Sequence, residues 1–226
     1  DYVYVPGGFK GSPPTSGVKD VMQRYDPATD SVTLLAPLPA PNFAHAVTAL
    51  GGEIFVLGGT EDRFGEAGTT NYIYDIATDT WRTGAPVPVP TGYAAAATDG
   101  TLIYLMGGLT EDWADMSEVQ IYDPAADSWT MGTPMLQARA GAGAFYDGQH
   151  IWVVGGGWFD YSSTTEFWNG TLWQHGPAMN TAVRTLGAAF GGGDALKAGG
   201  FNYPNNHEDD AEILDLDCTV GPSTTP

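Results

Sequence analysis

Five segments of the sequence contain aromatic rings, and all but the first also carry carboxylate or amide side chains. They cover residues 9–17, 60–66, 109–115, 157–161 and 201–210, and each follows a pair of glycines. Aromatic faces can stack on the C–H faces of a sugar while carboxylates and amides meet its hydroxyls, and such a mixture is typical of ligand sites. We therefore predict ligand-binding residues in these segments, at Asp112, Trp113, Trp158, Asp160, Tyr161, Tyr203 and Asn206.

The same segments also suit a positively charged peptide, because acidic side chains are concentrated in them. Complementary charge would draw such a peptide to the protein. The residues concerned are Glu61, Asp62, Glu111, Asp112, Asp115, Glu208, Asp209 and Asp210. The sequence leaves three alternatives open at this point: carbohydrate binding, peptide binding, and loops that only cover the ends of strands.

Three arginines stand near these segments in a chain that has only 8 basic residues against 27 acidic ones: Arg63, Arg139 and Arg184. A guanidinium presents several N–H donors in a planar fork and can hold a carboxylate or sugar hydroxyls. We include all three among the predicted ligand-binding residues. The alternative is that they pair with acidic residues of neighbouring loops.

Signals for catalysis or metal binding are weaker. Asp112 and Asp160 could supply the acid and base of a glycosidase, but carboxylates are so abundant that any pair is a weak indication. The four histidines show no metal-binding spacing. Calcium could bind at Glu208, Asp209 and Asp210, although no EF-hand spacing supports it. We predict no catalytic residue and no resident cofactor.

The segments are positioned by a repeat. The first glycines of the five pairs are Gly7, Gly58, Gly107, Gly155 and Gly199, at spacings of 44 to 51 residues. In the clearest copy, residues 103–108 read Ile-Tyr-Leu-Met-Gly-Gly, Tyr122 and Asp123 follow a variable loop, and Trp129 comes after a turn. A glycine is expected at the end of each apolar strand because the chain turns sharply beside another backbone, where a Cβ would obstruct it.

This pattern resembles the kelch repeat, in which an apolar strand ends in two glycines and a Tyr-Asp pair and a Trp follow. The resemblance implies an all-β, kelch-type β-propeller over residues 1–218, with five repeats visible. We favour a five-bladed ring, and the alternative is part of a larger or open propeller. A closed ring would be a monomer, whereas an open one would self-associate. Kelch propellers serve as binding modules and as enzyme scaffolds, so the resemblance does not choose between these functions.

The resemblance also assigns positions within each blade. The innermost strands are expected at 44–50, 93–98, 141–146 and 186–190, and Trp81, Trp129 and Trp173 should anchor one blade to the next, each indole N–H reaching a carbonyl. Equivalent positions of the repeats are called a column. Lys197 occupies the column that holds Val5, Val56, Leu105 and Val153 in the other repeats. This suggests a blade face exposed to water or to a partner, or a lysine whose head reaches the surface along a seam.

Composition limits the partners and suggests a location. The formal net charge of −19 would repel nucleic acid and anionic membranes, and no apolar run approaches the roughly 20 residues of a membrane span. Residues 219–226 form a Ser/Thr/Pro-rich tail or linker, typical of exported modular proteins. The single cysteine, Cys218, permits no internal disulfide.

Together these features favour a non-catalytic recognition module of a secreted, bacterial, multi-domain protein, which binds carbohydrate or protein. The alternatives are a scaffolding domain for a basic partner and a sugar-processing enzyme that uses loop carboxylates.

Overall fold

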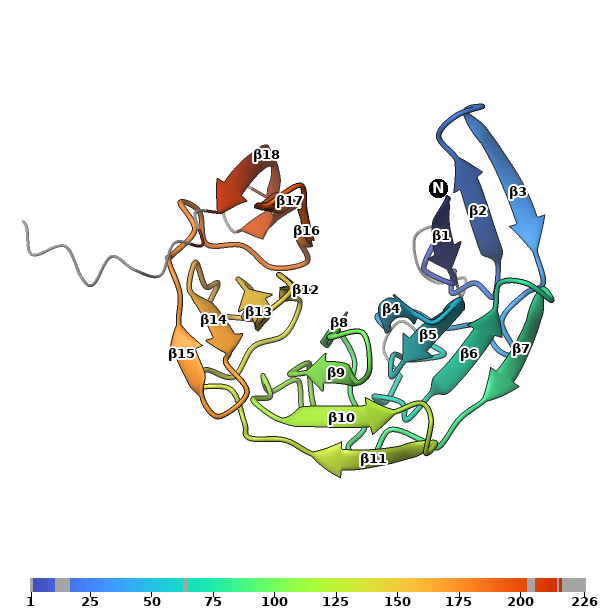
Figure 1. Cartoon of the computed structure of the whole chain (residues 1–226), viewed down its shortest axis with the longest axis horizontal. Helices are drawn as coiled ribbons and strands as arrows, with labels where there is room; N and C mark the ends of the chain where they lie inside the picture. Colours follow the sequence, from blue (N-terminus) through green and yellow to red (C-terminus); the bar gives the residue numbers. More distant parts are fainter. Residues whose placement is uncertain (1, 11–16, 63–64, 203–205, 215, 217–226) are drawn as a thin grey trace, which may run out of the picture.

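Eighteen strands make up five antiparallel sheets in the computed structural model, which describes residues 2–10, 17–62, 65–202, 206–214 and 216. The sheets are five blades arranged in a ring around one axis, with a gap between the ribbons of blades 1 and 5 (Figure 1), so the predicted all-β propeller with five blades is confirmed. The strands are β1 (Val3–Pro6), β2 (Met22–Asp26) and β3 (Ser31–Leu35) in blade 1; β4 (Ala46–Leu50), β5 (Glu53–Leu57), β6 (Asn71–Asp75) and β7 (Thr80–Thr83) in blade 2; β8 (Ala95–Thr98), β9 (Ile103–Met106), β10 (Val119–Asp123) and β11 (Ser128–Met131) in blade 3; β12 (Gly143–Tyr146), β13 (Ile151–Val154), β14 (Thr165–Trp168) and β15 (Trp173–His175) in blade 4; and β16 (Gly187–Gly191), β17 (Asp194–Asn202) and β18 (Asn206–Leu214) in blade 5.

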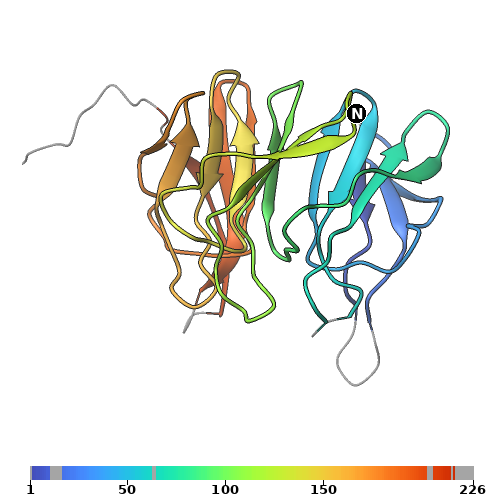
Figure 2. The same ribbon diagram turned by 90° about the horizontal axis from the view of Figure 1, so that it is seen from below.

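Each blade pairs its strands in chain order, from the centre of the ring outward. The inner strands β4, β8, β12 and β16 contact one another in that order. Blade 1 has no inner strand and blade 5 no outer strand among the described residues, so the inner strands are the four that the sequence predicted. Figure 2 shows the blades from the side, with the connecting loops at two opposite faces. No helix in the described ranges is long and apolar enough to cross a membrane.

The core lies between blades and not within them. Phe55 of blade 2 packs with Leu105 and Tyr122 of blade 3 in one buried cluster, and equivalent clusters join blades 1 and 2, 3 and 4, and 4 and 5. The second strand of a middle blade is therefore buried on both faces, and all four residues of β9 are buried. This explains why these strands are continuous apolar runs and do not alternate.

The column tryptophans connect neighbouring blades, as predicted. The indole N–H groups of Trp81, Trp129 and Trp173 donate to the carbonyls of Ala36, Ala85 and Thr133 respectively, each at 2.8 Å. Each acceptor lies in the segment that leaves the preceding blade. These tryptophans stabilise the interface between blades and take no part in a loop site.

The Tyr-Asp turn adds a second connection at the same place. The hydroxyl of Tyr122 donates to Asp127 at 2.5 Å, and the same carboxylate accepts the N–H of Ala85 in blade 2 at 2.7 Å. Burial, together with this hydrogen bond, raises the pKa of Tyr122 to about 12. The turn that contains Asp127 therefore does more than reverse the chain, because it also holds blades 2 and 3 together.

Lys197 does not face water. Its side chain is fully buried on the same side of β17 as Ala195, which packs against blade 4. The ammonium donates to the partly exposed carboxylate of Asp210 in β18 at 2.6 Å. The expectation of an exposed blade face at this position was wrong, and the alternative, a lysine that reaches toward the surface along a seam, describes it better.

His45 connects the first two blades through a hydrogen bond. Its burial leads us to expect that the stability of the fold depends on pH. Its Nε2 lies 3.1 Å from the carbonyl oxygen of Pro6, to which it donates as a neutral ring. Burial lowers the pKa of His45 to about 4, against an ordinary value of 6.5. The unfolded chain therefore binds a proton at higher pH than the folded one, and folding is disfavoured as pH falls from 6.5 toward 4.

We expect His45 to reduce the free energy of unfolding by about 2 kcal/mol between pH 7.5 and pH 4.5. The measurement is urea denaturation at both pH values for the wild type and for His45→Gln, whose amide donates to Pro6 without titrating. The comparison removes the effect of the acidic groups, which titrate in both proteins. Equal pH dependence in the two proteins would show that His45 is not the responsible group.

Candidate functional site

The loops between second and third strands lie on the same face as the segments that enter the inner strands. Backbone N–H groups of Gly8, Gly59, Gly108 and Gly156 donate to residues 42, 91, 139 and 183, which enter the next blade, at 2.8–2.9 Å. The loops and the entry segments thus form one surface, built from all five blades. It is called the loop face below.

The glycine pairs are required by this contact. Gly58 has a φ of 64°, and a Cβ placed on it would lie 2.4 Å from the carbonyl oxygen of Thr91. Real Cβ atoms do not approach an oxygen so closely, so only glycine fits here. The predicted close approach of two backbones is confirmed.

A chain of backbone hydrogen bonds runs around the axis at this face. Tyr93 N donates to Ala44 O at 2.6 Å, Gly141 N to Tyr93 O at 2.7 Å, and Thr185 N to Gly141 O at 2.6 Å. All four residues have left-handed φ, between 52° and 64°, which is uncommon for residues other than glycine. This geometry holds one residue from each of blades 2 to 5 at the centre of the loop face.

Aromatic rings from four blades form a continuous group there, which we call the aromatic arc: Phe9, Phe43, Tyr93, Trp158 and Trp113. Successive ring centroids are separated by 5.5 Å, 5.7 Å, 4.3 Å and 5.9 Å in that order. These separations are typical of favourable aromatic pairs. Trp113, at the end of the arc, is 38% exposed, and the other rings are half-buried.

Arg184 and Asp115 fix the position of Trp158. The guanidinium carbon of Arg184 lies 3.8 Å from the centroid of the Trp158 ring, and Nη1 donates to the Trp158 carbonyl at 2.5 Å. Both carboxylate oxygens of Asp115 accept the N–H of Trp158 at 3.0 Å. Burial raises the pKa of Asp115, while its hydrogen bonds and the charge of Arg184 oppose this shift. Trp158 is therefore preorganised before any ligand arrives.

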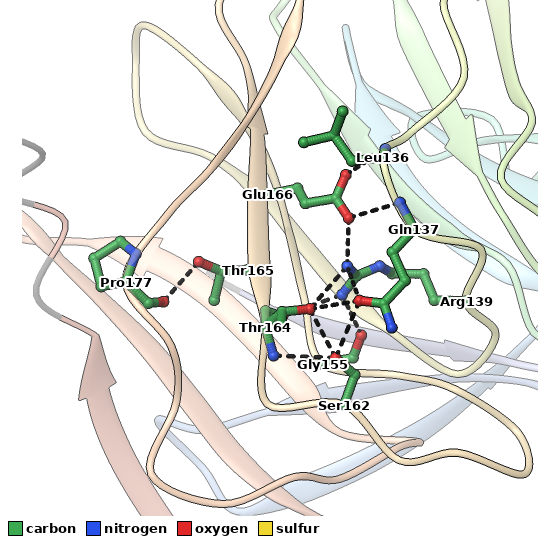
Figure 3. A network of polar contacts seen from close by, with 9 residues as sticks. All are labelled: Leu136, Gln137, Arg139, Gly155, Ser162, Thr164, Thr165, Glu166 and Pro177. Carbon is green, nitrogen blue, oxygen red and sulfur yellow. Dashed lines mark hydrogen bonds and ion pairs between the residues drawn. The ribbon is translucent and has the colours of Figure 1, made fainter. Parts of the chain in front are cut away.

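The side chain of Arg139 does not reach the surface of the loop face. Its side chain is fully buried and forms an ion pair with buried Glu166 of β14, Nη2 to Oε1 at 2.5 Å (Figure 3). Nη1 donates to the carbonyls of Gly155 and Thr164. The prediction that Arg139 binds ligand is not supported by this position, because no ligand can reach the group without unfolding the interface. The alternative of pairing with an acid holds, but the acid lies in a strand and not in a loop.

Arg139 performs a role that neutral residues take in other blades. Asn42 and Thr91 occupy the same place before their inner strands, and their side chains donate to the carbonyls of Gly58 and Gly107. Arg139 donates to Gly155, the equivalent glycine. The arginine is thus the blade 4 version of a structural contact.

A small pocket lies beside the aromatic arc. It has an accessible volume of about 30 Å³, and its walls include Thr60, Tyr93, Leu109, Glu111 and Trp113. The volume is far too small to enclose a sugar or peptide. A ligand of this face would therefore lie across the arc and insert only one group into the pocket.

The other predicted site residues are distributed unevenly. Asp112 and Asp160 are exposed, and Tyr161 is half-buried with its ring 6.0 Å from that of Phe201. Arg63, Tyr203 and Cys218 lie outside the described residues, as does the tail 219–226, and for Asn206 only the backbone, in β18, is described. These positions remain predictions.

No group of three or more His, Cys, Asp or Glu side chains suited to a metal ion occurs within the described ranges. Of the predicted calcium ligands, Asp210 holds Lys197, Asp209 is exposed, and the side chain of Glu208 is not described. A calcium site is not supported by the part that can be described.

Sequence reasoning missed Phe43 and Tyr93, which occupy the centre of the aromatic arc. Tyr93 was assigned only to the inner strand expected at 93–98, Phe43 lies just before the one expected at 44–50, and neither was considered as a site residue. Their signal was present: Tyr93 stands where the other blades have Ala44, Gly141 and Thr185. A large ring at a position that holds small residues in the other blades indicates a side chain that extends onto the loop face.

Comparison with known proteins agrees with this fold. Residues 41–88 and 90–136, which include blades 2 and 3, match the model of the Kelch motif. The solved structure of YjhT is similar with a TM-score of 0.84 and 16% sequence identity, over 96% of this chain and 79% of that chain. The sequences of curated proteins yield no match. The chain is thus a five-bladed β-propeller that is similar in fold to YjhT and carries two segments matching the Kelch motif.

Proposed function

We propose that this propeller is a non-catalytic recognition module that binds carbohydrate across the aromatic arc. The observation that carries the proposal is the arc itself, in which Trp113 is exposed beside Trp158 and Tyr93 on a rigid surface. Exposed aromatic rings in contact with one another offer flat apolar platforms, and the adjacent Asp112 and Glu111 can accept hydrogen bonds from hydroxyls.

The setting of the module is part of the proposal. Strong acidity aids the solubility of an exported domain, and the Ser/Thr/Pro-rich tail is typical of linkers in secreted modular proteins. We propose a secreted, multi-domain bacterial protein on these grounds.

A basic peptide is the second candidate ligand. Glu61, Asp62, Glu111 and Asp112 are exposed in the loops on either side of the pocket. Attraction of a cationic partner by these carboxylates would weaken strongly with salt, since the Debye length falls from about 10 Å at 0.1 M to about 3 Å at 1 M. Stacking of a neutral sugar would persist at 1 M salt.

The test uses a panel of neutral oligosaccharides and a lysine-rich peptide with the wild type and Trp113→Ala. We expect binding of at least one oligosaccharide that survives 1 M salt and is weakened about two- to tenfold by Trp113→Ala, the effect of losing one aromatic contact. The change in the free energy of unfolding should stay below about 1 kcal/mol, because the Trp113 side chain is well exposed.

Leu172→Ala is the matched control, since Leu172 is 46% exposed in the turn between β14 and β15, at the opposite face. It should leave binding unchanged. Binding of only the peptide, lost at high salt, would favour the second candidate. Turnover of a sugar that Asp112→Asn or Asp160→Asn abolishes would instead identify an enzyme.

A further inference from the structure

The two end blades each leave a strand edge without a partner strand among the described residues. β1 pairs only with β2, so its edge toward the axis is open, and β18 pairs only with β17, so its outer edge is open. In the complete blades 2 to 4, an inner strand and an outer strand occupy these positions. Open edges of this kind are templates for further strand pairing.

One apolar column shows that blade 1 lacks a neighbour on one side. In this column Val56, Leu105 and Val153 are buried, and each packs toward the preceding blade. Val5 holds the same position in blade 1 and is 47% exposed. Leu34, on the outer strand β3 of the same blade, is 71% exposed. The side of blade 1 that would face a preceding blade is therefore apolar and uncovered.

A second column shows the same for blade 5 on its other side. Phe55, Tyr104 and Trp152 are buried, and each packs toward the following blade. Leu196 holds this position in blade 5 and is 42% exposed. Ile213, opposite it on β18, is 67% exposed. Both end faces thus have the composition of a blade interface without the neighbour that would cover it.

The two uncovered faces lie on either side of one opening in the ring. Figure 1 shows the ribbons of blades 1 and 5 standing apart, whereas the other neighbouring blades adjoin. The chain of hydrogen bonds around the axis likewise runs from Ala44 in blade 2 to Thr185 in blade 5. One object that fills the opening would cover both faces together.

The size of that object follows from the similar structure. The aligned 96% of this chain, about 217 residues, makes up 79% of the YjhT chain, so about 58 residues of that chain have no counterpart here. The repeats of this sequence are 44 to 51 residues long. The difference therefore corresponds to one blade together with a short additional segment.

We infer that the opening is the docking site of one further four-stranded blade, supplied by polypeptide that is continuous with this chain and lies outside these 226 residues. One apolar face of that blade covers Val5 and Leu34, and the other covers Leu196 and Ile213. The same polypeptide adds an outer strand beside β18 and an inner strand beside β1. The inference is independent of the ligand proposed for the loop face.

The first test extends the chain with its own repeats. Residues 125–191, which contain β11, the whole of blade 4 and β16, are joined after Leu216, where they supply an outer strand, a blade and an inner strand. We expect a monomer in sedimentation, a higher Tm than that of the unextended chain, and at least tenfold slower amide exchange in Val3–Pro6 and in β18.

The matched control joins residues 125–146, which supply the outer and inner strands without a blade between them. It should give little protection to β1. Equal or better protection by this shorter extension would mean that five blades close the ring, and would overturn the inference.

The second test keeps the chain at its own length and does not depend on the extension folding. Val5→Cys and Leu196→Cys are combined with Cys218→Ser. If blades 1 and 5 were direct neighbours, these columns would face one another across about 10 Å, the usual spacing of stacked sheets. We expect that a bifunctional thiol reagent shorter than about 10 Å will not cross-link positions 5 and 196 within one chain.

Tyr104→Cys with Val153→Cys, also combined with Cys218→Ser, is the positive control, because these residues hold the same two columns and pack in one cluster across the interface of blades 3 and 4. Efficient cross-linking of positions 5 and 196 within one chain would overturn the inference. Efficient cross-linking between chains, with a dimer in sedimentation, would assign the opening to a second copy and would overturn it as well.

Discussion

Replacing Glu166 with alanine is expected to lower the free energy of unfolding by about 3–5 kcal/mol. The substitution leaves the buried guanidinium of Arg139 without its ion-pair partner. It also removes the carboxylate that accepts hydrogen bonds from the backbone N–H groups of Leu136 and Gln137, at 2.7 Å and 3.0 Å. An uncompensated buried charge is among the most destabilising changes in a protein core. Urea denaturation of the wild type and the variant measures the loss.

An exposed ion pair provides the control. Glu53 accepts two hydrogen bonds from Arg82 Nη2, but their side chains are 26% and 47% exposed. Glu53→Ala should cost no more than about 1 kcal/mol, because water solvates both partners. Similar losses for the two glutamate variants would contradict the interpretation of the Arg139 pair as a desolvated charge pair.

The neutral residues of blade 3 suggest a double variant that avoids the unpaired charge left by Glu166→Ala. There the equivalent positions hold Thr91 and Gln120, and Gln120 exchanges hydrogen bonds with the backbone of Val89. The double variant Arg139→Thr, Glu166→Gln places this neutral pair in blade 4. It should be more stable than Glu166→Ala, since no buried charge remains unpaired. A double variant less stable than the single one would show that packing of the Arg139 stem matters more than its charge.

Trp129→Ala is expected to cost about 3–5 kcal/mol, as the truncation of a packed aromatic residue does. The indole contacts Tyr122 with a centroid separation of 4.9 Å and donates to Ala85 across the interface of blades 2 and 3. Truncation removes both interactions and leaves a cavity between blades. Thermal and urea denaturation measure the loss.

Trp158→Ala, measured beside it, should cost well under that amount, because Trp158 lies half-buried in the loop face and forms no part of the clusters between blades. Its main effect should be weaker ligand retention. If Trp158→Ala destabilises the protein as much as Trp129→Ala does, Trp158 is a core residue, and the aromatic arc loses the ring that connects Tyr93 with Trp113.

The sequence by itself determined the repeat, the order of strands and the purpose of the repeated residues. Gly58 and Trp129 could be interpreted correctly because equivalent residues recur in several blades. A repeated backbone imposes one environment on equivalent positions, so a glycine or an indole that recurs there reports that environment. The four inner strands could be assigned for the same reason.

Only the tertiary structure decided the residues that depart from their columns. Arg139 looked like a surface cation, but Glu166, 27 residues later, provides a buried partner, and no local pattern predicts whether such a partner will be in reach. Lys197 is buried for a similar reason, since the carboxylate that pairs with its ammonium belongs to Asp210 of the adjacent strand. Tyr93 and Trp158 come from different blades and meet only because the ring bends the chain around one axis. Contacts between blades depend on the curvature of the whole ring, which no single repeat encodes, and the candidate site consists of such contacts.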